Sequence, residues 1–544
     1  MFNLFGAKPD HPMFDLDEAR RLLADLPVDD DFKALEEVTA WLDTVKDAAG
    51  FRSEVRAAIV MLLDETGQPL HSALLQLYLS APHLQDFQGL HQWKAIHGFM
   101  QTLAEAYAVC TDEYRENSKR SAEFRELMPL ICVRLLRAIA EQMKLELMRY
   151  IEVAPEVWQR LYKSYHFAEY EQFAASMLLP YPRHVIHTSP QREFLRALVL
   201  SVSSTETLAA DQTEVCYRIA GRLAGFFDLK DAPDADTPYC CDLTASAPPH
   251  RVKAGMQISP AKRFFAAHRA LPALEKIIGQ NESDPVWQER RFGSEFTPAG
   301  KLTVLKHLLI YWAKEPPHRH QERHGIDAAI EVTHGFRVVS SLVTRIDVGQ
   351  VADLSSEDAA ALKERERVSL VSEDVVHYET EMWQIQDMSG EGLGGVLPKN
   401  GAAWVKIGDL CGLKAPNGPL WWVGMIRRLH TDPNGAVHVG VEILARKPVS
   451  VWLRALGKGA EKASNWETSS GSFAYSYLPV ILLPDAHNSY MSATMLMESG
   501  SFVSGNIYQV MMGEKSRSIR LTALLAEGED YEQVSFQWLE PEHE

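Results

Sequence analysis

Residues 383–396 read WQIQDMSGEGLGGV, and this stretch decides the fold of the surrounding region. Trp383 and Ile385 alternate with Gln384, a pattern typical of a strand with one apolar face. Glycine then becomes frequent, with eleven glycines in the 51 residues 390–440. Because glycine is costly inside helices and useful in turns, this region predicts short strands joined by turns.

Further runs predict strands on both sides of this stretch. Upstream, every second residue from Ile326 to Val332 is apolar. Downstream, the predicted strands are 404–407, 421–427 and 437–444, with turn signals at 400–401, 417–419 and 432–435. We therefore expect a compact antiparallel β-barrel at 316–450 with a helix inserted at 355–368. Alternation returns after residue 475, so 451–544 is predicted to be a small β-rich segment.

The first half of the chain predicts helices instead. No glycine occurs between Gly98 and Gly221, and apolar residues recur there with a period of 3.6. The predicted helices include 90–111, 118–151, 155–177, 260–278 and 298–312. A Pro-rich acidic stretch at 229–259 predicts a linker. The fold class is thus multidomain α + β, with a helical domain at 1–228, this linker, a helical connector at 260–315 and the β-rich regions.

Composition narrows the function. The chain has 544 residues and a formal net charge of −18, which argues against wrapping DNA or RNA over a broad surface. The apolar run 127–140 contains two arginines and is shorter than the roughly 20 residues of a membrane span. The N-terminal residues show no secretory signal. The six cysteines, of which Cys240 and Cys241 are adjacent, predict free thiols and a cytoplasmic protein.

Two short motifs carry the candidate site. Residues 387–392 match D-x-S-x-x-G directly after a predicted strand, and R-x-x-x-R occurs at 52/56, 192/196, 218/222 and 319/323. Three of these pairs lie in helical stretches, where the spacing places both arginines on one solvated face. Arg319 and Arg323 instead follow two prolines and lead into a predicted strand. On such an arm, two guanidinium groups can bind phosphate and stack on a base.

This combination resembles the PilZ family of bacterial cyclic di-GMP receptors, whose barrel follows an R-x-x-x-R arm and contains a D/N-x-S-x-x-G turn. The resemblance covers about 130 residues. It implies that Arg319 and Arg323 grip the phosphates and stack on guanine. It also implies that Asp387 and Ser389 hydrogen-bond the guanine edge or a phosphate. In such a barrel Gly392 permits the tight turn, and cyclic di-GMP is the ligand without any further cofactor.

The sequence departs from the family pattern in two respects, a long spacing and a competing arm. Arg323 and Asp387 are 64 residues apart, which is more than is usual in the family and requires the helix at 355–368 to be an insertion. A competing arm, with Lys363 and Arg367, stands nearer to Asp387, but glutamates between them would oppose an anion. We favour Arg319 and Arg323, because the strand that follows them alternates cleanly. A barrel of PilZ shape that binds no nucleotide is the alternative.

The histidines His318, His320 and His324 cluster beside this arm, but no nearby cysteine or carboxylate pair completes a zinc site, so we expect no metal. Common nucleotide-binding and hydrolase motifs are also missing, and we expect no enzyme. The predicted protein is a cytoplasmic cyclic di-GMP effector that controls motility, attachment and biofilm, exopolysaccharide or virulence, with its helical half binding a protein partner. The alternatives are a ligand-free interaction scaffold and a hydrolase or transferase within the helices.

Overall fold

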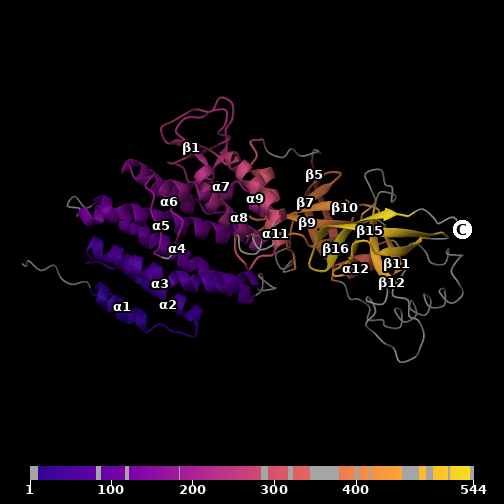
Figure 1. Ribbon diagram of the computed structural model, residues 1–544, viewed down its shortest axis with the longest axis horizontal. Helices are drawn as coiled ribbons and strands as arrows, with labels where there is room; N and C mark the ends of the chain where they lie inside the picture. The colour runs from indigo at the N-terminus through magenta and orange to yellow at the C-terminus, as the bar shows by residue number, and fades with distance from the viewer. Residues whose placement is uncertain are drawn as a thin grey trace, which may run out of the picture. The chain divides into compact units, whose positions relative to one another are not determined.

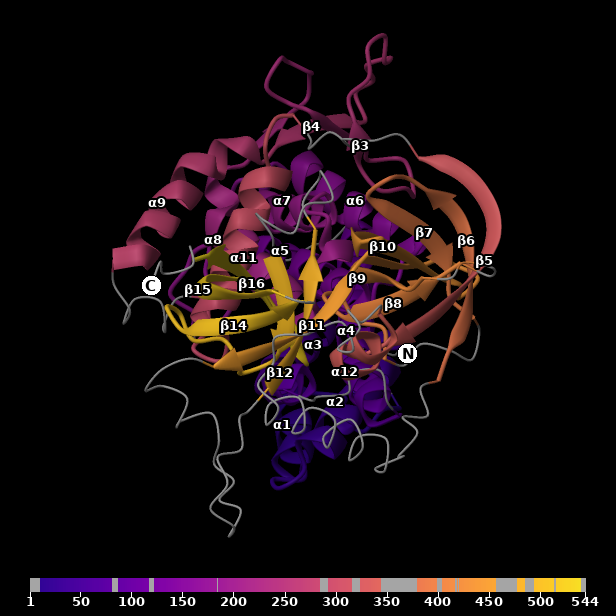
Figure 2. The same cartoon turned by 90° about the vertical axis from the view of Figure 1, so that its right-hand side faces the viewer.

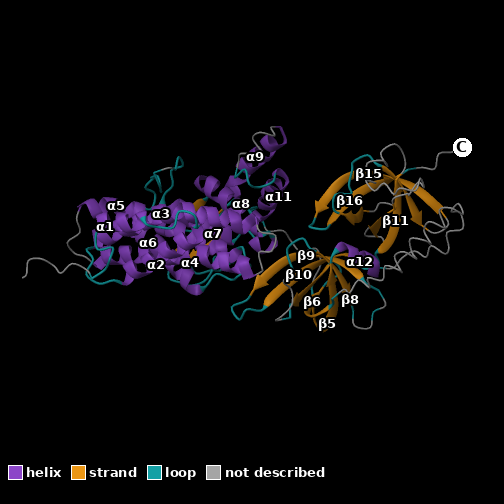
Figure 3. Cartoon of the chain, turned by 90° about the horizontal axis from the view of Figure 1, so that it is seen from below, coloured by secondary structure: helices purple, strands orange, loops and turns teal. Residues whose placement is uncertain are grey.

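The computed structural model describes residues 10–80, 87–116, 122–182, 184–283, 292–315, 323–343, 379–398, 404–415, 418, 420–455, 477–484, 494–512 and 515–539. The chain forms two units, Met1–His318 and Arg319–Glu544. We call them the helical unit and the barrel unit. Figure 1 shows the elements of each unit along the chain, and the colours of Figure 3 separate the helices of the first from the strands of the second.

The helical unit is built from amphipathic helices, as the period of 3.6 predicts. Its first helix begins at Asp15, whose carboxylate accepts hydrogen bonds from the backbone N–H groups of Asp17 and Glu18 at 3.1 and 3.0 Å. The helices are α1 (Leu16–Ala24), α2 (Asp31–Asp47), α3 (Ser53–Ser80), α4 (Phe87–Glu116), α5 (Ala122–Leu147), α6 (Pro155–Tyr170), α7 (Pro190–Ser201), α8 (Ala210–Leu223), α9 (Leu271–Ser283) and α11 (Pro298–Tyr311). Their apolar faces share one continuous core. Among the described residues, no helix is long and apolar enough to cross a membrane.

The linker predicted at 229–259 is wrong. Together with the start of the predicted helical connector, this segment forms an antiparallel sheet in the order β1-β4-β2-β3, beside the helices of the same unit. Its strands are β1 (Asp228–Lys230), β2 (Tyr239–Asp242), β3 (His250–Arg251) and β4 (Lys262–Ala266). Both thiols at 240 and 241 are buried in it and free, as predicted. The apolar side chains of this sheet extend the helical core, so the prolines mark turns and not a free linker.

The barrel unit contains two closed six-stranded antiparallel barrels (Figure 2). The first barrel has the order β10-β7-β6-β5-β8-β9 and a short helix, α12 (Phe336–Leu342), after its first strand. Its strands are β5 (His324–His334), β6 (Glu381–Met388), β7 (Gly392–Val396), β8 (Leu410–Lys414), β9 (Trp422–Thr431) and β10 (Val437–Ala445). The predicted barrel is therefore confirmed, whereas the helix predicted at 355–368 lies outside the described residues.

Alternation correctly predicted which side chains fill the first barrel. Trp383 and Ile385 are buried, whereas Met382, the residue before Trp383, is exposed. The strand predicted at 404–407 is wrong, because Trp404 lies in a turn. The Trp404 indole stacks on the His334 ring, with centroids 4.3 Å apart, and its Nε1 donates to Glu381 Oε1 at 2.9 Å.

The predicted β-rich segment at the C-terminus is a complete second barrel. Its order is β11-β12-β13-β16-β15-β14, and its strands close around an apolar core of their own. They are β11 (Val449–Ala455), β12 (Tyr477–Leu483), β13 (Thr494–Glu498), β14 (Ile507–Met512), β15 (Lys515–Glu527) and β16 (Tyr531–Trp538).

An apolar cluster joins the two barrels. Phe336 and Val339 of α12 pack in it with Ile481 and Leu496 of the second barrel. Polar contacts surround it: the Tyr531 hydroxyl donates to the carbonyl of Gly408 at 2.8 Å. The barrel unit is thus one folded body with a shared core, because each barrel covers apolar surface of the other.

Candidate ligand-binding site

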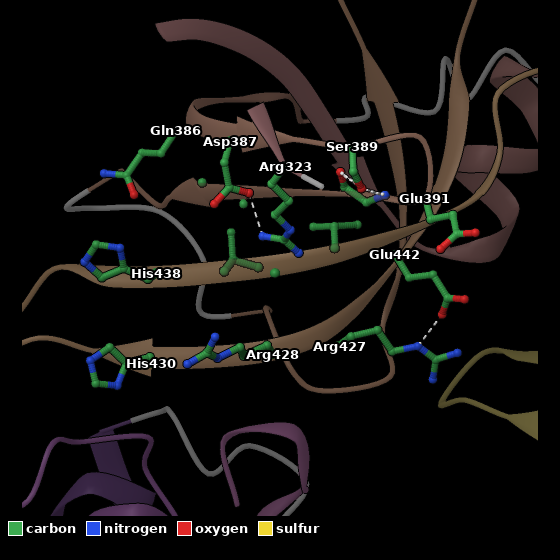
Figure 4. Close-up of a pocket in the computed structure, with 16 residues that line it drawn as sticks. Arg323, Gln386, Asp387, Ser389, Glu391, Arg427, Arg428, His430, His438 and Glu442 are labelled. Atoms are coloured by element: carbon green, nitrogen blue, oxygen red, sulfur yellow. Dashed lines mark hydrogen bonds and ion pairs between the residues drawn. The ribbon is translucent and has the colours of Figure 1, made fainter. Parts of the chain in front are cut away.

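A pocket of about 530 Å³ lies on the outer surface of the first barrel and is shown in Figure 4. Strands β6, β7, β9 and β10 form it, and we call it the barrel pocket. Four of the predicted site residues meet there: Arg323, Asp387, Ser389 and Gly392. Arg319, Lys363 and Arg367 lie outside the described residues, so the choice between the two arms stays a prediction.

Arg323 and Asp387 face each other across the junction of two strands. Arg323 comes directly before β5, which pairs with the end of β6, where Asp387 lies. The guanidinium Nη1 donates to Asp387 Oδ1 at 2.5 Å, and the two side chains are 31% and 39% exposed. This ion pair brings together groups 64 residues apart in the chain and leaves both partly open to solvent.

Glycines form the surface beneath this pair. A Cβ at Gly394 would lie 2.7 Å from Asp387 Oδ1 and 3.0 Å from Arg323 Nη1, so only glycine leaves the pair its present position. A Cβ at Gly392 would lie 2.8 Å from the backbone oxygen of Val441. The pocket floor is therefore bare backbone, which lets a flat ligand approach closely.

Ser389 shapes the turn between β6 and β7. Its hydroxyl accepts from the backbone N–H of Gly392 at 3.2 Å, and its own N–H donates to the Gly392 carbonyl at 2.8 Å. Outside the turn, Arg446 Nη2 donates to the Ser389 carbonyl at 2.9 Å, while its guanidinium lies 4.4 Å from the centre of the Trp422 ring. The side chain of Ser389 thus hydrogen-bonds the backbone of its own turn in this structure. Arg446 stabilises the same turn through its hydrogen bond to the Ser389 carbonyl.

Several basic residues of the pocket are missing from the sequence prediction. They lie on β9 and β10 and are Arg427, Arg428, His430 and His438. A β-bulge shifts the register between these strands, so the neighbouring Arg427 and Arg428 are both exposed in place of alternating. The two histidines are paired across the strands and lie side by side in Figure 4. The adjacent arginines were the available signal, but a bulge cannot be read from a single sequence.

The charges of the barrel pocket are nearly balanced. Arg427 Nε donates to Glu442 Oε2 at 2.6 Å, just as Arg323 pairs with Asp387. With Arg428 and Glu391, the lining contains three arginines and three carboxylates. Such exposed pairs are weak and easily exchanged, so an anionic ligand can replace a carboxylate as the partner of an arginine.

Comparison with known families gives two matches on this chain. Residues 17–234 match the family described as "Cyclic-di-GMP receptor FimW, N-terminal domain". Residues 468–539 match the "FimW C-terminal beta-barrel domain". Both ends of the chain are similar to FimW. The FimW family is a family of cyclic di-GMP receptors, and the two matches cover most of the helical unit and much of the second barrel.

The first barrel lies between the two matched regions, and it carries the motifs that resemble PilZ. No curated protein and no solved structure matches the chain.

Proposed function

We propose that this protein is a cytoplasmic cyclic di-GMP effector that binds its ligand in the barrel pocket. The observation that carries the proposal is the meeting of Arg323, Asp387 and the turn at Gly392 in one pocket, although the chain between them is long. The similarity to a cyclic di-GMP receptor family at both ends of the chain supports the choice of ligand.

On this proposal, Arg323 contacts both a phosphate and a guanine base of the ligand. Its Nη1 edge is held by Asp387, which fixes the plane of the guanidinium and leaves the remaining N–H groups to donate to a phosphate. A planar guanidinium over a glycine surface also offers a face on which guanine can stack. Arg319 would supply the second guanidinium of the arm.

On this proposal, Asp387 accepts a hydrogen bond from the edge of the guanine base. Within the described residues it uses only Oδ1, for Arg323, so Oδ2 can accept an N–H of guanine. Arg428 on β9 would add positive charge near the second phosphate of the ligand. On this proposal, binding changes how the protein presents its helical half to a protein partner that controls motility, attachment, exopolysaccharide or virulence.

Calorimetric titration of the full chain with cyclic di-GMP tests the site. We expect saturable binding at tens of micromolar or tighter, and a loss of about tenfold to hundredfold on Arg323→Ala or Asp387→Ala, because each removes a charge-assisted contact. Arg319→Ala should act in the same direction. Arg337→Ala is the matched control, since Arg337 is exposed on the same unit and pairs with Glu498 away from the pocket.

Two outcomes would count against the proposal. If a folded protein gives no binding, the ligand-free scaffold is the better description. If Lys363→Ala and Arg367→Ala abolish binding while Arg319→Ala and Arg323→Ala do not, the competing arm is the one in use.

A further inference from the structure

A second arginine-lined cavity lies in the helical unit, far along the chain from the barrel pocket. It has a volume of about 830 Å³, and we call it the helical cavity. Five arginines from three helices line it: Arg137 of α5, Arg192 and Arg196 of α7, and Arg218 and Arg222 of α8. Two R-x-x-x-R pairs that the sequence predicted to be solvated therefore converge on one space. That prediction is wrong for Arg196, which is 7% exposed.

Carboxylates do not balance these arginines. Glu193 is the acidic residue among the described lining, and it is shared by Arg196 at 3.5 Å and Arg137 at 3.8 Å. Arg218 has its own partners, Glu214 at 2.7 Å and Glu295 at 2.8 Å. Within the described part of the chain, neither Arg192 nor Arg222 has a carboxylate partner. The cavity thus keeps an excess of positive charge.

A neighbouring cavity of the same unit shows that this excess is local. There, Lys144 lies 2.7 Å from Glu214 and also pairs with Glu141, so its cation is matched by carboxylates. The lining of that neighbouring cavity includes three glutamates, Glu65, Glu141 and Glu214. It shares Arg137, Arg196 and Arg218 with the helical cavity, whereas Arg192 and Arg222 line the helical cavity and not this one. The helical unit therefore neutralises the buried Lys144 with carboxylates, whereas the half-buried Arg192 and the exposed Arg222 at the helical cavity have no carboxylate partner among the described residues.

The arginines of the helical cavity are held in place by the fold. The Arg196 guanidinium lies 3.4 Å from the centre of the Tyr217 ring, and its Nε donates to the Tyr217 carbonyl at 3.3 Å. Gly221 provides the room, because a Cβ there would lie 2.8 Å from Arg196 Cζ. Gly225 does the same for Arg192, whose Nη2 lies 3.0 Å from the position of a Cβ. Side chains fixed in this way lose little entropy when they bind.

The rim of the helical cavity adds apolar surface. Phe226 is 52% exposed, and Val185 and Ile186 are also exposed. His184 also lines the cavity. Partial burial, and then the charge of Arg137, lower the pKa of His184, so its ring is neutral at pH 7 and adds a hydrogen-bonding group without charge. A ligand that fits would join an anionic group to an apolar or aromatic part.

We infer that the helical cavity is a binding site for a phosphate-bearing small molecule. The N–H groups of a guanidinium match the geometry of a phosphate. The positive charges of Arg192 and Arg222, which have no carboxylate partner among the described residues, attract the phosphate. The exposed Phe226 gives the non-phosphate part of the ligand an aromatic surface. This site is separate from the barrel pocket in sequence and in residues, and it does not depend on cyclic di-GMP binding there.

The test uses the full chain with Arg323→Ala and Arg428→Ala, which weakens the barrel pocket, and inorganic pyrophosphate as the probe. Calorimetric titration in a chloride buffer of low ionic strength should show saturable binding of one pyrophosphate. Arg192→Gln with Arg222→Gln should weaken that binding by about tenfold or more, because two charge-assisted contacts are lost. Removing these two cations leaves no carboxylate unpaired, so the fold should remain intact.

Arg20→Gln with Arg21→Gln is the matched control, since both arginines are exposed on α1 and the change in net charge is the same. This control should bind as the parent does. Absence of saturable binding, or equal weakening by the control, would overturn the inference. If the double variant fails to fold, Arg222→Gln alone decides, because Arg222 is exposed: the inference requires a weaker affinity for pyrophosphate, and an unchanged affinity contradicts it.

Discussion

The helical unit buries charge, whereas the barrel unit keeps it at the surface. Among the described residues, nine charged side chains are buried in the helical unit and one, Glu532, in the barrel unit. The nine are Arg56, Asp64, Arg134, Lys144, Glu146, Glu193, Arg196, Glu214 and Lys301. Long helices offer carbonyls and carboxylates that can surround a buried cation, while the interior of a small barrel has room only for packed apolar side chains. A charged side chain without a partner therefore stands out in each unit. It indicates either a ligand-binding site or an unfavourable contribution to the stability of the fold.

The largest effect should come from a buried cation that is fully partnered. Arg134 donates to the Pro180 carbonyl at 2.8 Å and to Glu65 at 2.7 Å, and it lies 3.6 Å from the buried Asp64. Arg134→Met should lower the free energy of unfolding by about 3–5 kcal/mol, because the fully buried Asp64 and the Pro180 carbonyl would lose their cation, and the more exposed Glu65 would lose an ion pair. Arg222→Met should change it by less than about 0.5 kcal/mol.

Urea unfolding followed by circular dichroism measures both values. Equal effects of the two substitutions would show that partnered and unpartnered arginines contribute equally to the stability of this unit. That result would contradict the distinction drawn between them.

The barrel unit should show the cost, in stability, of a carboxylate that is partly buried. Burial raises the pKa of Asp409 to about 7, although the Lys406 N–H donates to it. The stability associated with this raised pKa is fully present below about pH 4 and is lost as the pH rises through about 7. Asp409→Asn should remove that loss and stabilise the protein at pH 8 by at most about 4 kcal/mol.

Unfolding midpoints at pH 5 and pH 8 test this prediction. Glu498→Gln, which alters a carboxylate that pairs with Arg337 in the same unit, should leave the pH dependence as it is. The explanation is wrong if Asp409→Asn retains the full loss of stability between the two pH values.

The smallest effect on the fold should come from the barrel pocket itself. Gly394→Ala places a methyl group against the ends of Asp387 and Arg323, which are flexible enough to move. We expect the stability to change by less than about 1 kcal/mol and the affinity for cyclic di-GMP to fall by about tenfold. Gly325→Ala is the control, because the nearest atom to its Cβ would be 3.9 Å away. An unchanged affinity in Gly394→Ala would separate the ion pair from ligand binding.

The sequence predicted what depends on local periodicity. Strands β6 and β10 follow from alternation, because one face of each strand is buried and the pattern is visible in a single sequence. The meeting of Arg323 with Asp387 followed from motifs that resemble a known family. The sheet of the helical unit escaped prediction, since strands of two to five residues are too short to show a period.

Contacts between distant elements could not be predicted in the same way. Arg192 and Arg222 lie on two different helices. Each belongs to an R-x-x-x-R pair, Arg192 with Arg196 and Arg222 with Arg218, and that spacing is ordinary for a solvated helix face. Only the packing of α7 against α8, with Gly221 and Gly225 close to Arg196 and Arg192, brings both faces to one cavity. The basic residues on β9 were missed for a related reason, because a bulge depends on the partner strand.

The apolar cluster between the barrels has a consequence for genetics. A premature stop codon after β10 would spare every residue of the barrel pocket but remove Ile481, Leu496 and Tyr531 from the shared core. Phe336 and Val339 would then face water. Stop codons between the end of β10 and the end of β16 should therefore abolish the function of the whole protein, and a screen that reports only loss of function would place the proposed ligand site in the wrong domain.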